Sequence, residues 1–269
     1  MSRTVPILLY HRVGHLDGSF MDEYTVSPIA FLEQMGAIAR WGWRPIALES
    51  LLEDDIRDQR TRPLVITFDD GFASNREHAW PVLERYRFPS ATFVVTGHLG
   101  TYNYWDGPSR ANYPLLGAAD LAAADSQLMT FHAHSMTHSD LTFVVNDVDC
   151  LRQELGESRD CLSKMGLGGD IFAYPRGSWN WDLLEQVRKA GYVGACTSME
   201  GLNSSRTNPF LLRRVEIRDS DVGWRFRLKV LSGRDLVRLP LSRPPEVSIL
   251  GRWLRHKLRS DGKRNGLPS

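Results

Sequence analysis

Short apolar runs alternate with longer amphipathic segments over the first 217 residues of the chain. The runs are rich in valine, isoleucine, leucine and phenylalanine, and most of them are continuously apolar, as is typical of strands buried on both faces. They occupy residues 5–10, 64–68, 91–96, 128–133, 171–174, 192–196 and 211–217. We predict a β-strand at each of these seven positions.

The segments between the runs predict helices. Ser27 and Pro28 are typical of an N-cap and a first helical turn, and apolar residues at helical spacing continue to Ile38, shortly before Gly42. Similar patterns cover residues 75–86, 146–165 and 181–190. This strand–helix alternation favours a parallel sheet, either open and doubly wound or closed into a barrel. Both folds place their chemistry at the carboxyl ends of the strands.

The length of 269 residues suits one large domain, or one domain with an appendage. No apolar run approaches the roughly 20 residues of a membrane-spanning helix. The first residues lack the apolar length and the cleavage site of a secretory signal. Cys150, Cys161 and Cys196 lack the spacing of a metal site. From these features we expect reduced thiols and a cytoplasmic location.

A net charge of +1 conceals an asymmetry, because residues 213–269 carry 15 basic and 6 acidic side chains while residues 1–212 carry 18 and 26. A basic end suggests attraction to lipid head groups, lipid-linked phosphates or nucleic acid. A solvated surface explains the same asymmetry. Residues 249–258 could form a short basic helix. We expect no nucleic-acid partner, because the region has no structured basic motif and no aromatic platform.

Side chains of metal-ligand type follow several predicted strands. Asp69 and Asp70 come directly after one strand, and His134 and His138 come after another. A spacing of four places two imidazoles on one face of a helical turn, where they can share a metal. With one aspartate they form a set that suits catalytic Zn²⁺, Co²⁺, Ni²⁺ or Fe²⁺, while the other aspartate is free to act as a base. Taken separately, Asp69 and Asp70 are more typical of a turn after a strand, and His134 and His138 are more typical of two unrelated surface histidines.

Three segments together resemble the polysaccharide deacetylase family, which includes chitooligosaccharide and peptidoglycan deacetylases. They are Thr67–Gly71, His134–Leu141 and Phe172–Gly177. The resemblance spans roughly residues 5–217 and implies an α/β fold, a distorted (β/α)₇ barrel. It also implies metal-dependent hydrolysis of N-acetyl groups on sugars. We therefore expect a catalytic barrel over residues 1–218 and a basic, partly irregular appendage over residues 219–269.

The resemblance assigns roles to individual residues. Asp70, His134 and His138 would hold the metal, and Asp69 would be the general base. Most members carry a further catalytic histidine near the C-terminus, where this chain has only His256 beyond residue 138. Deacetylases of poly-N-acetylglucosamine instead carry this histidine near the N-terminus, in a context that residues 9–13 match. The resemblance therefore implies that His11 is the general acid.

The chain departs from the family pattern at three positions. Ala173 stands where an arginine often orients the base, so Arg176 or Arg214 would take over that task. Arg176 replaces an aromatic residue, and its backbone N–H would still bind the oxyanion. His132 stands where a small residue is common, and either lines the site or packs as a structural histidine.

The resemblance also implies an N-acetylated glycan or a lipid-linked sugar as substrate and one divalent metal ion, for which we expect Zn²⁺. The predicted reaction removes N-acetyl groups during the synthesis of a surface polysaccharide or glycolipid. The basic C-terminus would suit peripheral contact with the inner membrane face. Hydrolysis of non-sugar amides and glycan binding without catalysis are the alternatives. The residues expected to contact substrate are Tyr174, Pro175, Trp105 and Trp179.

Overall fold

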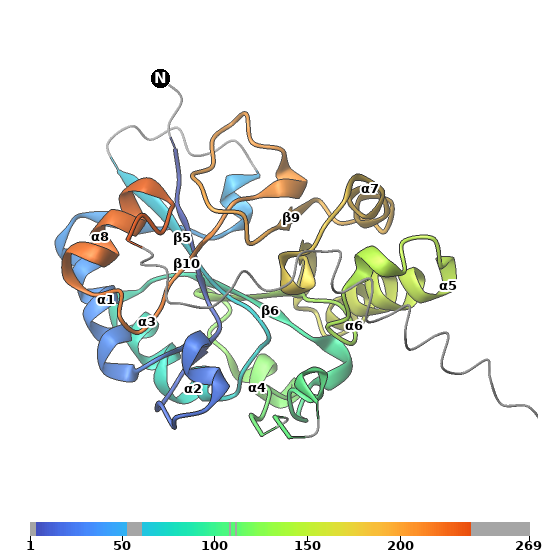
Figure 1. The fold of residues 1–269 in the computed structure, drawn as a ribbon, viewed down its shortest axis with the longest axis horizontal. Helices are drawn as coiled ribbons and strands as arrows, with labels where there is room; N and C mark the ends of the chain where they lie inside the picture. Colours follow the sequence, from blue (N-terminus) through green and yellow to red (C-terminus); the bar gives the residue numbers. More distant parts are fainter. Residues whose placement is uncertain (1–3, 53–60, 108, 111, 238–269) are drawn as a thin grey trace, which may run out of the picture. The chain divides into compact units, whose positions relative to one another are not determined.

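A parallel β-sheet forms the centre of the protein (Figure 1). The computed structural model describes residues 4–52, 61–107, 109–110 and 112–237. The sheet has eight strands in the order β10-β1-β5-β6-β7-β8-β9, with β4 paired to β5, and every pair is parallel.

Each of the seven predicted strand positions contains a strand of this sheet. The strands are β1 (Ile7–Tyr10), β5 (Arg62–Phe68), β6 (Ser90–Val94), β7 (Met129–Ala133), β8 (Gly168–Ala173), β9 (Gly194–Cys196) and β10 (Val215–Glu216). The eighth strand, β4 (Trp43–Pro45), was not predicted because its three residues are not an apolar run. A separate parallel pair joins β2 (Arg12–Val13) to β3 (Thr25–Val26).

A short stretch of chain connects the two edges of the sheet. Leu212 donates its N–H to the Ala195 carbonyl of β9, at 3.0 Å. Three residues later Val215 pairs with Leu8 of β1, and Ile217 N–H donates to the Leu9 carbonyl at 2.9 Å. This stretch turns the parallel sheet into the distorted (β/α)₇ barrel that the resemblance implied.

Alternating side chains of the strands face two different apolar layers, as pleating requires. One layer contains residues such as Ile7, Val65 and Ile171 and fills the barrel interior. The other contains the neighbouring Leu8 and Ile66, packed against the surrounding helices. The same alternation directs polar side chains that follow the strands toward the mouth of the barrel.

Helices surround the barrel, and the four predicted helical segments are all present in the described residues. The helices are α1 (Pro28–Arg40), α2 (Ser74–His78), α3 (Trp80–Tyr86), α4 (Ala118–Ala123), α5 (Val148–Leu151), α6 (Ser158–Lys164), α7 (Trp181–Lys189) and α8 (Gly223–Ser232). Ser27 caps α1 as predicted, since its hydroxyl accepts from Ala30 N–H. Within the described chain no helix has the length and apolar character needed to cross a membrane.

Two of the predicted helices are interrupted. The helix predicted over residues 75–86 is divided into α2 and α3, because Pro81 has no N–H to donate to the preceding turn. A π-helix, η6 (Arg152–Glu157), joins α5 to α6. The remaining short helices are 3₁₀ turns: η1 (Phe20–Tyr24), η2 (Glu49–Leu51), η3 (Thr96–His98), η4 (Tyr104–Asp106), η5 (Leu141–Phe143), η7 (Pro175–Gly177) and η8 (Pro209–Leu211).

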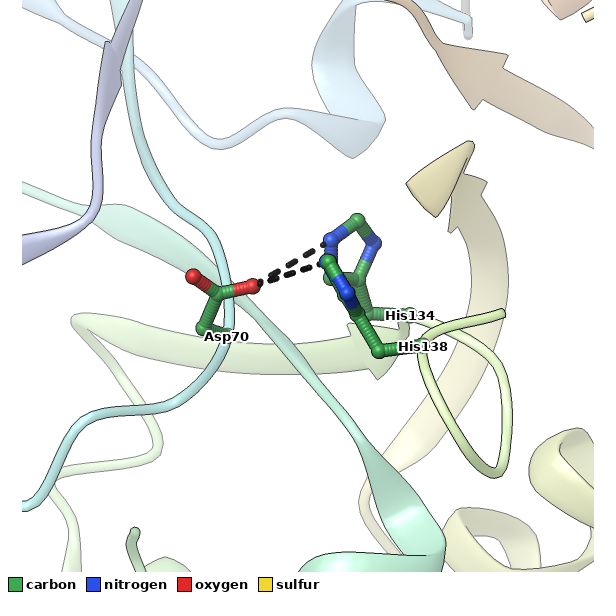
Figure 2. Close-up of side chains that lie close together, drawn as sticks. All are labelled: Asp70, His134 and His138. Atoms are coloured by element: carbon green, nitrogen blue, oxygen red, sulfur yellow. Dashed lines mark ion pairs between the residues drawn. The ribbon is translucent and has the colours of Figure 1, made fainter. Parts of the chain in front are cut away.

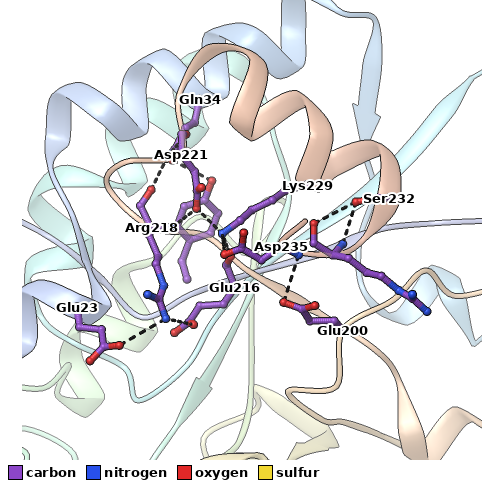
Figure 3. Close-up of polar contacts among 11 residues, drawn as sticks. Glu23, Gln34, Glu200, Glu216, Arg218, Asp221, Lys229, Ser232 and Asp235 are labelled. Carbon is purple, nitrogen blue, oxygen red and sulfur yellow. Dashed lines mark hydrogen bonds and ion pairs between the residues drawn. The ribbon is translucent and has the colours of Figure 1, made fainter. Parts of the chain in front are cut away.

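Helix α8 lies beyond residue 218 and nevertheless packs against the barrel. Phe226 and Val230 are buried in its apolar layer. The buried ammonium of Lys229 lies 2.6 Å from Asp221 Oδ2 and 2.9 Å from Asp235 Oδ2, within a larger polar network (Figure 3). The compact unit therefore continues to Leu236. The helix predicted over residues 249–258 lies outside the described residues, and the division into barrel and appendage stays a prediction.

Candidate active site

Asp70, His134 and His138 meet at the carboxyl ends of β5 and β7 (Figure 2). Asp70 Oδ1 lies 3.3 Å from His138 Nε2 and 3.5 Å from His134 Nε2. All three residues are buried, and in the described part of the chain Asp70 Oδ1 has no hydrogen-bond partner. One carboxylate oxygen and two imidazole nitrogens, gathered within 4.8 Å of one another, form a donor set that fits a divalent transition metal.

The backbone at this cluster adopts unusual conformations. Asp70, Ser135 and His138 have φ values of 71°, 65° and 60°, in the left-handed region that residues other than glycine seldom occupy. The predicted helical turn at 134–138 is wrong, because these residues form a loop after β7. The left-handed residues of this loop bring the two imidazoles together. Such strain is found preferentially at functional sites.

Neighbouring groups hold the two histidines in place. His134 Nδ1 donates to the Ala173 carbonyl at 2.9 Å, which leaves Nε2 facing Asp70. Ser135 Oγ accepts the His138 N–H at 3.0 Å. The Trp105 ring packs on His138 with 4.7 Å between centroids. Contacts of this kind orient metal ligands and raise metal affinity.

Asp69 is held by a buried arginine rather than exposed to solvent. Arg214 Nη1 and Nη2 donate to Asp69 Oδ1 and Oδ2 at 2.6 and 2.7 Å, and Arg214 Nε donates to the Thr197 carbonyl at 2.9 Å. Burial alone would raise the pKa of Asp69, but the Arg214 charge and hydrogen bonds hold that pKa below its ordinary value. Of the two arginines considered from the sequence, Arg214 is therefore the one that orients Asp69.

His11 follows β1 on the same side of the barrel. Asn75 fixes the backbone there, because its Nδ2 donates to the His11 carbonyl at 2.8 Å and its Oδ1 accepts Val13 N–H at 2.7 Å. Burial raises the pKa of Asp70, whereas the nearby imidazoles of His134 and His138 and the charge of His11 lower it well below its ordinary value. His11 thus lies within electrostatic range of the candidate metal ligands. Sequence reasoning missed Asn75, which lies in a predicted helix.

Arg176 lies in η7, just after β8, with a left-handed φ of 59°. Its side chain is exposed, and within the described residues no hydrogen bond or ion pair involves it. Burial lowers the pKa of His138, and the Arg176 charge lowers it further.

Asp106 is a third carboxyl near this site. Burial and the charge of Asp70 raise the pKa of Asp106, although hydrogen bonding and nearby positive charge oppose the change. Asp106 is the last residue of the 3₁₀ turn η4, away from any strand end, so the strand-end pattern offers no signal for it.

The residues expected to contact substrate have different surroundings. Tyr174 and Pro175 are buried, and the Tyr174 hydroxyl donates to the Phe210 carbonyl at 3.2 Å. The Tyr174 ring belongs to the apolar layer under the helices, and the contact of Tyr174 with substrate stays a prediction. Trp105 and Trp179 are partly buried. Two further aromatic side chains of the Trp105 loop are more exposed: Tyr102 at 44% and Tyr104 at 53%.

His132 occupies the barrel interior, one layer below the metal cluster. Its Nε2 lies 2.9 Å from Glu49 Oε1, and its ring packs on Phe93. Burial raises the pKa of Glu49, but hydrogen bonding and charge interaction with His132 bring that pKa below its ordinary value. Of the two alternatives left open by the sequence, the structural histidine is the one observed.

The fold and the site define a class: a parallel (β/α) barrel with a candidate mononuclear metal centre at the carboxyl ends of its strands. A sequence model of the polysaccharide deacetylase family matches residues 56–195, slightly more than half of the chain. The chain belongs to the polysaccharide deacetylase family.

Individual relatives are similar to this chain over part or all of the barrel. Poly-beta-1,6-N-acetyl-D-glucosamine N-deacetylase of Staphylococcus aureus is 24% identical over 160 residues, which cover 59% of this chain and 55% of that protein. The chain thus spans about half the length of this relative. Deacetylase PplD of Streptococcus pyogenes superposes with a TM-score of 0.72 and 21% identity, covering 86% of this chain and 99% of that structure. IcaB from Ammonifex degensii superposes with a TM-score of 0.68 and 22% identity, and the match covers 81% of this chain and 94% of that structure.

Proposed function

We propose that this protein is a metal-dependent N-deacetylase of amino-sugar glycans or their precursors. The observation that supports this most directly is the gathering of Asp70, His134 and His138 beside an aspartate fixed by Arg214. The similarity to a poly-N-acetylglucosamine deacetylase supports the same substrate class.

Asp70, His134 and His138 would hold one divalent cation, for which Zn²⁺ is our proposal, with Co²⁺, Ni²⁺ and Fe²⁺ as alternatives. The chemistry that such a cation supplies when bound is polarisation of the acetyl carbonyl and activation of water. The three ligand side chains leave coordination positions open, as catalytic sites require.

The other residues would carry out the proton transfers. Asp69 takes a proton from the attacking water, and Arg214 keeps its carboxylate ionised and correctly oriented. The backbone N–H of Arg176 donates to the developing oxyanion. His11 gives a proton to the leaving amine. The rigid fork of Arg214 is suited to its task because both of its terminal nitrogens reach the same carboxylate.

The exposed guanidinium of Arg176 suggests a feature of the substrate. It lies close enough to lower the pKa of His138 and carries no ion pair in the described chain, so it is available to an anionic group of the glycan. A lipid-linked sugar, whose phosphate adjoins the acetamido sugar, offers such a group. Arg176→Ala should then raise KM more for a phosphate-bearing substrate than for neutral N-acetylglucosamine oligomers. Equal changes for both substrates would contradict this assignment.

A glycan-binding protein without activity was an alternative because Ala173 replaces the usual arginine. Arg214, which directly precedes β10, meets the same need, and this supports the catalytic proposal. Hydrolysis of non-sugar amides remains a competing proposal. A panel of cyclic amides and acetylated glycans separates the two.

The decisive experiment measures acetate release from N-acetylated glycans, polymeric and lipid-linked, with and without a chelator. We expect Asp69→Asn to lower turnover by about 10²- to 10⁴-fold while metal stays bound. Asp160→Asn, a matched change at an exposed position on α6, should leave turnover unchanged. Activity that survives complete metal removal, or near-normal turnover of Asp69→Asn, would refute the proposed mechanism.

The place of action is a separate part of the proposal. We propose a cytoplasmic enzyme that contacts the inner membrane face through its basic C-terminus, supported by the charge asymmetry of residues 213–269. Deleting residues 240–269 should weaken binding to anionic vesicles. Unchanged binding would overturn this part and leave the catalytic proposal intact.

A further inference from the structure

The loop between the two candidate histidine ligands is held by a single buried carboxylate. Glu154 Oε2 accepts the backbone N–H groups of Met136 and Thr137 at 3.0 and 3.1 Å. Glu154 Oε1 accepts the Thr137 hydroxyl at 2.6 Å. Glu154 is only 5% exposed, so these bonds form away from water.

The carboxylate is committed to this loop. No lysine or arginine of the described chain pairs with Glu154, although buried carboxylates ordinarily require a cationic partner. The two carboxylate oxygens of Glu154 instead accept hydrogen bonds from three donors, and all three donors lie between His134 and His138 in the sequence. Hydrogen bonds to an ionised acceptor are about twice as strong as neutral ones.

The helix that carries Glu154 is irregular at this point. Glu154 belongs to the π-helix η6, and π-helical turns are frequently found at functional sites. Four residues later, Ser158 Oγ accepts the Thr96 hydroxyl at 2.9 Å, and Thr96 N–H donates to the Ser135 carbonyl at 3.1 Å. The π-helix therefore supports the loop directly through Glu154, and the adjoining α6 supports it indirectly through Ser158 and Thr96.

The loop needs external support because its own conformation is unfavourable. Ser135 and His138 are both left-handed, a conformation that is strained for residues other than glycine. A relaxed loop would separate the two imidazoles.

We infer that Glu154 is a positioning residue of the metal centre: by binding residues 136 and 137 it keeps His134 and His138 at the separation that one cation requires. The inference rests on the proposed metal site. It assigns to Glu154 a role in metal affinity and none in proton transfer.

The test measures metal affinity in the full-length chain after removal of bound metal. Co²⁺ binding is followed by visible absorption, and Zn²⁺ binding by competition with a coloured chelator. Glu154→Gln should raise the Kd for both ions about 10- to 100-fold, as loss of such supporting contacts usually does. Thr137→Val removes one donor and should raise Kd about 2- to 10-fold. The thermal midpoint of each metal-free variant is measured beside wild type.

Glu157→Gln is the matched control. Glu157 lies in the same π-helix, but its side chain is 45% exposed and pairs with Arg152. We expect the Kd of the Glu157→Gln variant for Co²⁺ and Zn²⁺ to equal that of wild type. Should Glu154→Gln fail to fold, Thr137→Val decides the question alone.

Wild-type affinity in both loop variants, or an equal loss in the Glu157→Gln control, would overturn the role of Glu154. Failure of the proposed function gives a different result. In that case the wild-type protein would bind no metal, or the Asp70→Asn variant would bind metal as tightly as wild type. The two failures are therefore distinguishable.

Discussion

Replacing Arg214 with methionine should destabilise the protein more than any change at an exposed ion pair. Arg214 and Asp69 have side chains only 1% and 5% exposed, and two hydrogen bonds of 2.6 and 2.7 Å join them. Arg214→Met leaves the Asp69 carboxylate buried without its partner. Breaking a buried pair in this way costs about 3–5 kcal/mol. That is a large fraction of the 5–15 kcal/mol by which folded domains are typically stable.

Urea unfolding of wild type, Arg214→Met, Asp69→Asn and the double variant gives the coupling energy between the two side chains. We expect the double variant to lose less stability than the sum of the single changes, with a coupling energy of about 1–3 kcal/mol. Arg188→Met is the control, because its ion pair with Glu185 on α7 has side chains 58% and 50% exposed. Such a surface pair contributes about 0–1 kcal/mol.

The pH dependence of the same measurement follows from the lowered pKa of Asp69. Because folding lowers this pKa, the pair stabilises the protein above about pH 4, the usual range of an aspartate, and the stabilisation is lost as the pH falls through the folded value. Arg214→Met should therefore lose less stability than wild type on acidification. A cost below about 1 kcal/mol, or a coupling energy near zero, would refute the reasoning.

Three other results are expected. Zn²⁺ at 100 times its Kd should stabilise wild type by about 2.7 kcal/mol, and Asp70→Asn should abolish this gain in thermal unfolding. Gly177→Ala should destabilise the protein more than Gly166→Ala in urea, because both glycines have positive φ but only the new Cβ at 177 would clash with the Ser198 side chain. Burial raises the pKa of Cys196 to about 12, so a thiol reagent at pH 8 should label it only after unfolding. Rapid labelling of all three thiols of the folded protein would contradict this.

The hydrophobic pattern alone determined much of this fold. Continuous apolar runs predict strands wherever both faces are buried, and seven such runs correspond to β1 and β5–β10. Polar residues directly after a strand must lie at its carboxyl end, so Asp70, His134 and His138 could be predicted to share one side of a parallel sheet. The family resemblance then made the barrel the expected form of that sheet.

Only the tertiary structure decided how those ligands are held. The partner of Asp69 lies 145 residues away, and sequence left Arg176 and Arg214 as equal candidates. The loop at 134–138 had the spacing of a helical turn, yet left-handed residues and hydrogen bonds to Glu154 give it another shape. These features depend on contacts between distant strands and helices. Local propensity and periodicity carry information on neighbouring residues only, so they determine which elements form and leave the contacts between them to packing.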